Sequence, residues 1–168
     1  MRQICSSIVS VLFVSVGAAH STAAQSAAAV HTKIQANYTY MDAALDHGNL
    51  EGALAFYEPG YVLVSNKGGV SSLEARQRAY QKIIAHASSL KSDTRINSEK
   101  ISGNTATVLT THHANAVIAN ALTGQFSTYQ TTDLTKEIWV RRGNLWLVKI
   151  GYTLSTRFTV DGRPSGNN

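Results

Sequence analysis

In the first part of the chain, apolar residues recur at helical spacing and short turn signals interrupt the pattern. One buried helix face is predicted at Ile34, Tyr38, Met41 and Leu45. Gly48 follows the last of these positions and ends the helix, because glycine adopts the left-handed conformation at little cost. Asn49 then caps a second helix, which we predict over Leu50 to Tyr57. The pattern therefore predicts two consecutive helices joined by a tight corner.

A strand and a third helix are predicted next. Pro59-Gly60 is expected to stop the second helix, and Tyr61 to Val64 reads as a strand. Ser71-Ser72-Leu73-Glu74 is typical of a capping box and begins the third helix. The buried stripe of this helix is predicted to consist of Leu73, Tyr80, Ile83, Ile84 and Ala87, and the exposed side of Arg76, Arg78, Gln81 and Lys82.

From Leu90 onward the pattern is that of strands. Four strands are predicted at Asp93 to Ile101, Thr105 to Ile118, Gly124 to Val140 and Leu145 to Thr159. Short polar turns join consecutive strands, which favours antiparallel pairing. Strands this long must twist or curl, so the sheet has a concave side on which apolar helix faces can be buried. The predicted fold class is therefore α+β: three N-terminal helices packed on the concave face of a strongly curved antiparallel sheet, a cone-shaped barrel.

The first 24 residues have the composition of a secretory signal peptide. They carry one arginine, an apolar run too short to span a bilayer, and small residues before an expected cleavage after Ala24. Residues 25–161 are expected to form a single domain and 162–168 a disordered tail. Since Cys5 is the only cysteine and lies in the signal segment, we expect no disulfide or thiol chemistry in the mature chain. The expected location is the periplasm or the outside of the cell.

Charge and motifs exclude several classes of function. The chain carries 15 Lys and Arg against 10 Asp and Glu, and these basic residues are scattered, so neither nucleic acid nor, after signal removal, a membrane is an expected partner. The sequence contains no phosphate loop and no dinucleotide-binding glycine motif, so no cofactor is expected. The histidines show no metal-ligand spacing, and no metal site is predicted.

Three stretches resemble one family, the nuclear transport factor 2-like superfamily. They are AALDHGNLEGALAFYEPGYVLVSNKGG from Ala43, GNTATV at Gly103 to Val108, and KEIWVRRGNLWLVKIGYTLS at Lys136 to Ser155. The family includes ketosteroid isomerases, SnoaL-like polyketide cyclases and exported proteins of unknown function. The resemblance spans roughly Val30 to Ser155 and implies the cone-shaped fold and a homodimer. It does not specify an activity, because the fold hosts enzymes, binding proteins and assembly domains.

The isomerase branch of this family provides a test. Its chemistry needs a carboxylate base and two acidic hydrogen-bond donors that hold an oxyanion. Laid on this chain, the family pattern places Ser65 at the base and Met41 at the oxyanion tyrosine, whereas the acidic donor falls on Lys136 or Glu137. Serine is no base at neutral pH. The resemblance therefore carries no catalytic residue over to this chain.

Several polar residues remain as candidates for a pocket. Of the adjacent pair His112 and His113, His112 shares its strand face with the apolar alternate residues and is expected to point inward, where it could act as a base. The pattern places Glu137 with Asp133 on the outer face, unless a bulge shifts the register. Ligand-binding candidates are Tyr38, Met41, Ser65 and His112; weaker candidates are Tyr80, Tyr129 and Glu137.

Three hypotheses of function follow. The first is an exported protein that binds a small apolar ligand in a mostly apolar pocket and has lost the isomerase residues. The second is a cyclase or lyase-type enzyme that uses His112 or Glu137 as the proton carrier. The third is an assembly module that dimerises through the outer sheet face, with Trp139 and Tyr129 as anchors.

Overall fold

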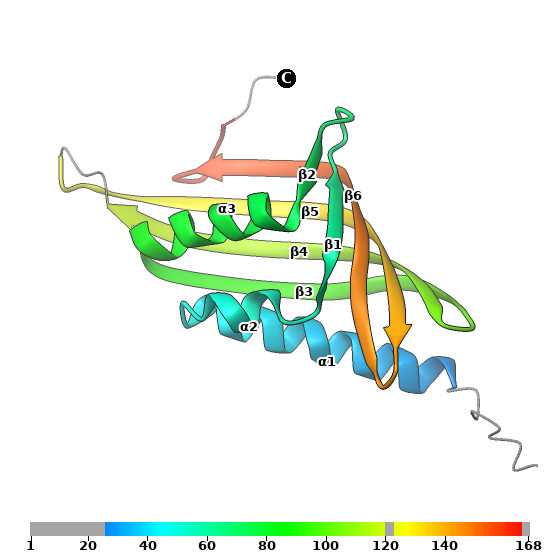
Figure 1. The fold of residues 1–168 in the computed structure, drawn as a ribbon. Coiled ribbons are helices and arrows are strands. Elements are labelled where there is room, and N and C mark those ends of the chain that lie inside the picture. Colours follow the sequence, from blue (N-terminus) through cyan, green and yellow to red (C-terminus); the bar gives the residue numbers. More distant parts are fainter. Residues whose placement is uncertain (1–25, 120–122, 166–168) are drawn as a thin grey trace, which may run out of the picture.

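Three helices and a long curved sheet make up the computed structural model, which describes residues 26–119 and 123–165 (Figure 1). The helices are α1 (Ala27–Asp46), α2 (Leu50–Leu54) and α3 (Leu73–His86). The strands are β1 (Tyr57–Val64), β2 (Val70–Ser72), β3 (Ala87–Ser102), β4 (Thr105–Ala119), β5 (Phe126–Arg142), β6 (Leu145–Val160) and β7 (Arg163–Pro164). The predicted signal segment lies outside the described residues. The predicted α+β cone fold is confirmed.

The corner between α1 and α2 forms as predicted. Gly48 has a φ of +72°, and the side chain of Asn49 accepts a hydrogen bond from the Gly52 amide at 3.0 Å. The second helix, however, ends at Leu54 rather than at Tyr57. Tyr57 already belongs to β1, and Pro59-Gly60 lies inside this strand, between two paired stretches whose register shifts. A proline is tolerated there because an irregular strand segment does not need its missing amide.

The sheet has the order β2-β1-β6-β5-β4-β3, and β7 pairs with β6. The β3–β4, β4–β5 and β5–β6 pairs are antiparallel, as their short connections predict. In contrast to the predicted antiparallel sheet, β1 runs parallel to β6, so the sheet is mixed. A parallel neighbour requires a long crossover, and here the chain from β2 to β5 provides it.

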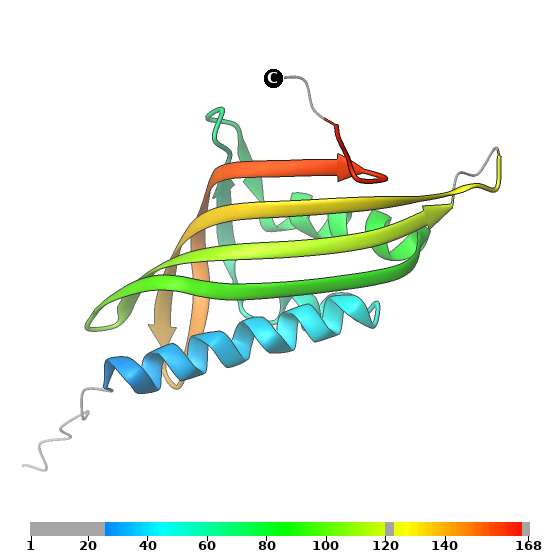
Figure 2. The same cartoon turned by 180° about the vertical axis from the view of Figure 1, so that it is seen from behind.

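Strong curvature turns the sheet around the helices (Figures 1 and 2). The strands β3 to β6 have 15 to 17 residues each, and register shifts occur in the β3–β4 and β5–β6 pairs. Such bulges increase the local twist and bend a long strand. The helices lie on the concave side, and Figure 2 shows the opposite face of the sheet uncovered by helices.

The core lies between α1 and the sheet. Its largest fully buried side chains are Trp139, Trp146, Tyr61 and Ile34. Trp139 is 0% exposed, which overturns its expected role as an anchor on the outer face. The reason is its strand parity: Trp139 pairs with Ala106 of β4, and both point into the cone.

The C-terminal residues differ from the expectation of a disordered tail. Arg163 and Pro164 form β7, which pairs with Val160 and Thr159 of β6 after a turn at Asp161-Gly162. Backbone pairing orders this segment as far as 165, and 166–168 lie outside the described residues. Within the described parts of the chain, no helix combines the length and apolar character needed to cross a membrane.

Candidate functional site

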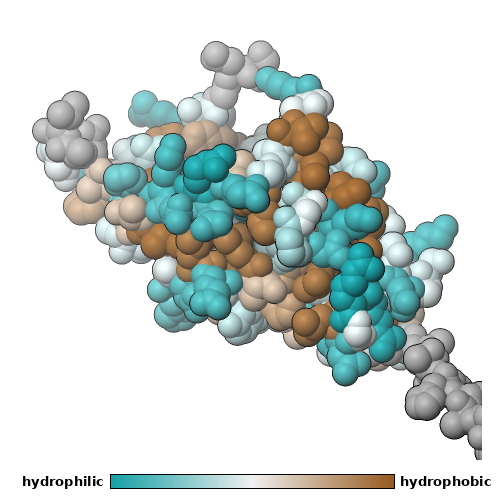
Figure 3. All heavy atoms as spheres, in the orientation of Figure 1, coloured by the Kyte–Doolittle hydropathy of each residue, from teal (hydrophilic) through white to brown (hydrophobic). Residues whose placement is uncertain are grey.

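A pocket of about 300 Å³ opens between the helices and the concave face of the sheet. Its wall on the helix side is mostly apolar, whereas the strands contribute a row of polar side chains. In Figure 3 apolar atoms are visible at the surface between α3 and the α1–α2 pair, with hydrophilic residues on both sides. The helices and β1 provide Tyr38, Met41, Asp42, Leu45, Ala53, Tyr57, Leu63, Arg76, Tyr80 and Ile83; β3 to β6 provide Leu90, Thr94, Thr110, His112, Ala114, Thr131, Asp133, Thr135, Glu137 and Thr153.

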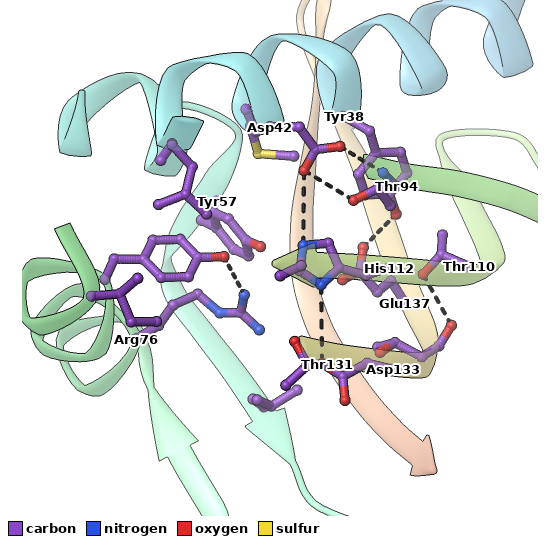
Figure 4. A pocket seen from close by; sticks show the side chains of 18 of the residues that line it. Tyr38, Asp42, Tyr57, Arg76, Thr94, Thr110, His112, Thr131, Asp133 and Glu137 are labelled. Atoms are coloured by element: carbon purple, nitrogen blue, oxygen red, sulfur yellow. Dashed lines mark hydrogen bonds and ion pairs between the residues drawn. The ribbon is translucent and has the colours of Figure 1, made fainter. Parts of the chain in front are cut away.

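His112 lies between two carboxylates inside this pocket (Figure 4). Its Nε2 is 4.0 Å from Oδ1 of Asp42 on α1, and its Nδ1 is 4.0 Å from Oδ2 of Asp133 on β5. Asp42 is held in place by Thr94, whose backbone amide and hydroxyl donate to its two oxygens at 2.7 and 3.1 Å. Asp133 accepts a hydrogen bond from the hydroxyl of Thr156 at 2.6 Å. Both carboxylates are thus oriented before any ligand arrives.

Burial changes the titration of this group. It lowers the pKa of His112, an effect that nearby Asp133 partly opposes, so the neutral imidazole persists at neutral pH. Burial also raises the pKa of Asp42 to about 6, although its hydrogen bonds from Thr94 act in the other direction. A neutral imidazole beside carboxylates can accept a proton and then be stabilised as a cation.

A second polar group lies deeper, where α1 meets β5. The hydroxyl of Tyr38 donates to Oε2 of Glu137 at 2.5 Å, and Nε1 of Trp139 donates to both Tyr38 Oη at 2.9 Å and Glu137 Oε2 at 3.2 Å. Burial raises the pKa of Glu137, and burial together with Glu137 raises that of Tyr38 well above the usual value. Glu137 is 6% exposed and lines the pocket.

Arg76 lies on the opposite side of the pocket among three tyrosines, of which Tyr57 and Tyr80 line the pocket. The guanidinium carbon lies 5.1, 5.4 and 5.6 Å from the ring centres of Tyr57, Tyr61 and Tyr80. Its Nη1 donates to Tyr80 Oη at 2.8 Å and its Nη2 to Tyr61 Oη at 3.2 Å. Tyr57 and Tyr61 pack edge to face with their centres 4.6 Å apart. We call this group the arginine cage.

Most predicted candidates meet in this one cavity. Tyr38, Met41, His112, Tyr80 and Glu137 all line it. The inward orientation predicted for His112 is confirmed, since it lies 4.0 Å from Asp42 of α1, across the pocket.

Ser65 and Tyr129 are not among the residues that line the pocket. The Ser65 hydroxyl accepts from the Gly69 amide at 2.9 Å and closes the turn between β1 and β2. Tyr129 lies near the start of β5, and its ring stacks on that of Phe158 with the centres 6.1 Å apart. The family pattern places Ser65 at the position of the base, but sequence similarity alone does not show that the chain turns away from the cavity at this residue.

The outward placement of Glu137 and Asp133 was wrong. On β5 the inward set is Thr131, Asp133, Thr135 and Glu137, with no bulge needed to bring it there. The aliphatic residues of the other parity, such as Ile138, face outward. Polar side chains are tolerated inside because Tyr38, Trp139 and Thr156 donate hydrogen bonds to them.

Asp42 and Arg76 were missed by sequence reasoning. Asp42 lies next to the predicted apolar stripe of α1, and Arg76 was expected to be exposed. Arg76 lies three residues after Leu73 and four before Tyr80, so helical spacing alone places it on the buried side of α3. This spacing was the available signal. Among the described residues, no group of three or more His, Cys, Asp or Glu side chains is arranged to hold a metal ion.

Comparisons with known proteins identify the fold. No family model and no curated protein matches the sequence. Among solved structures, a hexachlorocyclohexane dehydrochlorinase (LinA, type 2) aligns with a TM-score of 0.60 and 9% identity over 84% of this chain and 92% of that one. A putative scytalone dehydratase from Novosphingobium aromaticivorans aligns at 0.59 and 12% identity, over 74% and 84%.

A third structure carries the family's name. A nuclear transport factor 2-like superfamily protein from Salmonella enterica aligns with a TM-score of 0.57 and 16% identity, over 85% of this chain and 96% of that one. These identities are low, so the alignments establish a shared backbone and no shared activity. The chain therefore has the nuclear transport factor 2-like fold, in agreement with the resemblance found in the sequence.

Proposed function

We propose that the chain is a lyase-type enzyme in which His112 removes a proton from a carbon atom of a small substrate. The observation that carries this proposal is the position of His112 inside the pocket, between the oriented carboxylates of Asp42 and Asp133. A base whose pKa is near or below the working pH, in a partly dry site, is what such chemistry requires. The fold supports a small ligand-binding or enzyme-like domain. The type of reaction is what we propose beyond that.

The proposed reaction is an elimination. An imidazole nitrogen of His112 takes the proton, the electron pair of the broken C–H bond forms a double bond, and the leaving group departs from the neighbouring carbon with its bonding pair. Asp42 and Asp133 stabilise the imidazolium, which afterwards returns the proton to the leaving group or to water. The names of two solved structures with this fold, a dehydrochlorinase and a dehydratase, denote eliminations and agree with this choice.

A generic probe tests the base without knowledge of the natural substrate. The ring of 5-nitrobenzisoxazole opens when a base removes its carbon-bound proton, and the phenolate product absorbs visible light. We expect turnover above that of buffer, with a rate that falls in acid as His112 becomes protonated. His112→Gln should abolish the excess rate, and Asp42→Asn should lower it about 10- to 100-fold.

His113 provides the matched control. It is the adjacent histidine, exposed on the other face of β4, with Nδ1 3.0 Å from the Thr132 hydroxyl. His113→Gln should keep the full rate. Equal losses in the two histidine variants, or no turnover by the unaltered chain with this probe, scytalone or hexachlorocyclohexane, would count against the proposal.

Binding without turnover is the second candidate. It is favoured by the apolar wall formed by residues such as Met41, Leu45 and Ile83 and by the 4.0 Å separations, which are too long for direct hydrogen bonds between His112 and its carboxylates. In this case hydrophobic small molecules should raise the melting temperature of the protein, and His112→Gln should leave that shift unchanged.

We also propose that the mature chain is exported and forms a homodimer. Export is supported by the composition of the first 24 residues, and mass spectrometry of protein from the periplasm or medium should find an N-terminus at Gln25.

Dimerisation is supported by half-buried aliphatic residues on the outer sheet face, Leu134, Ile138 and Val140. Sedimentation equilibrium tests it, and a monomer at high concentration would refute it.

A further inference from the structure

Arg76 is a half-buried cation that forms no ion pair among the residues described. No carboxylate of this part of the chain lies within 4.0 Å of its nitrogens, and its Nε atom is buried without any hydrogen-bond partner. Two of its five N–H groups reach tyrosine hydroxyls. An N–H group that is shielded from water without a partner is costly, and an anion that accepts its hydrogen bond removes this cost.

The nearby acids form no ion pair with Arg76, although the charge of Glu137 acts on it over a longer distance. Glu137 is a buried carboxylate of this pocket, but its Oε2 already accepts hydrogen bonds from Tyr38 and Trp139. Asp42 and Asp133 flank His112 instead. Figure 4 shows the Arg76 guanidinium and the His112 ring directed into the cavity from opposite sides. The cation therefore faces the space that a ligand would fill.

The arginine cage selects for a planar anion. Tyrosine rings surround the guanidinium, and the tyrosine hydroxyls accept one hydrogen from each Nη. The free Nε–H together with a remaining Nη–H forms a fork with two parallel donors. Two such donors match the two oxygens of a carboxylate. The rings of Tyr57 and Tyr80 offer flat apolar surface for the rest of the molecule.

We propose that Arg76 binds the carboxylate of the substrate, so that the substrate class is a small, preferably aromatic, carboxylic acid. This rests on the proposed function in that the acid occupies the same cavity and presents its carbon skeleton to His112. Held at one end by Arg76, the ligand spans the pocket towards the base. Arg76 is then the residue that determines specificity, and His112 the one that reacts.

Calorimetric titration with benzoate and benzamide tests this assignment. The two molecules have nearly the same shape and differ in charge. We expect benzoate to bind, benzamide to bind about 10- to 100-fold more weakly, and Arg76→Gln to weaken benzoate by a similar factor while leaving benzamide unchanged. Arg76→Lys keeps the charge without the planar fork and should recover only part of the affinity.

Arg78, exposed on the same helix, supplies the control, since Arg78→Gln changes the net charge equally and should bind benzoate like the unaltered chain. Equal affinity for the two probes, or equal losses in the Arg76 and Arg78 variants, would overturn the proposal; so would failure of benzoate to bind. If Arg76→Gln folds poorly, two other measurements test the proposal. They are the benzoate affinity of Arg76→Lys and the change of the Arg76 Nε–H resonance, observed by NMR, when benzoate is added. Benzoate and benzamide carry no leaving group, so their binding is measured independently of the proposed turnover.

Discussion

Asp42→Asn should change how the stability of the protein depends on pH. The pKa of Asp42 is raised by burial from 3.8 to about 6, so the folded chain binds this proton more tightly than the unfolded chain does. The stabilisation from the bound proton is fully present below pH 3.8 and is lost as the pH rises through about 6. A difference of about 2 units corresponds to about 3 kcal/mol. Asparagine does not ionise and suffers no such loss.

Urea unfolding at a series of pH values measures this effect. The free energy of unfolding of Asp42→Asn minus that of the unaltered chain should increase by about 2 kcal/mol from pH 4 to pH 8. Asparagine cannot accept both hydrogen bonds from Thr94, which lowers the stability of the variant. This loss is the same at every pH, so it does not affect the change with pH. Repeating the comparison in a His112→Gln background removes the titration of the neighbouring ring.

Asp46 offers a control on the same helix. Its Oδ1 accepts from the backbone amide and hydroxyl of Ser92 at 2.7 and 2.9 Å, much as Asp42 accepts from Thr94, but Asp46 lies outside the pocket beside Lys91. The link between the pocket and the raised pKa would be refuted if the difference in unfolding free energy for Asp42→Asn stayed constant or decreased as the pH rises. It would also be refuted if Asp46→Asn showed the same trend.

Two further substitutions test the packing around the site. Tyr38→Phe removes a donor to the buried Glu137 and should lower the free energy of unfolding by about 1 to 3 kcal/mol, measured by urea titration; an unchanged midpoint would show that Glu137 needs no such donor. Gly151→Ala should destabilise the fold by about 1 to 3 kcal/mol, because a Cβ at this position would lie 2.7 Å from the hydroxyl of Tyr61. It should also weaken benzoate binding, since Tyr61 holds Arg76; a variant with normal melting temperature and affinity would contradict this.

The sequence predicted the helix and strand pattern well because that pattern depends on local periodicity. The corner at Gly48-Asn49 and the hairpin turn at Gly143 need particular backbone angles, and the residues that provide them are visible in the sequence. The predicted ends of the elements were wrong where pairing between strands distant in sequence determines them. Tyr57 continues a helical pattern, yet it belongs to β1, whose pairing with β6 is parallel and links residues distant in sequence.

The site could be predicted only in part. His112 was placed inward because its strand neighbours are apolar, but Glu137 and Asp133 were placed outward by the same criterion, since apolar residues dominate the other parity of β5. The register decides the matter: His112 pairs with Asp133, and side chains opposite each other in an antiparallel pair share a face. An inward His112 therefore requires an inward Asp133 and, four residues on, an inward Glu137.

By itself the sequence determined the elements, the α+β class and the direction of one histidine, because spacing, caps and alternation are local properties of the chain. Only the tertiary structure decided that Asp42, His112 and Asp133 meet and that Arg76 enters a cage of tyrosines. These groups come from helices and strands separated by up to 91 positions. Their meeting depends on strand register and on the curvature of the sheet, and neither is encoded in any short stretch of residues.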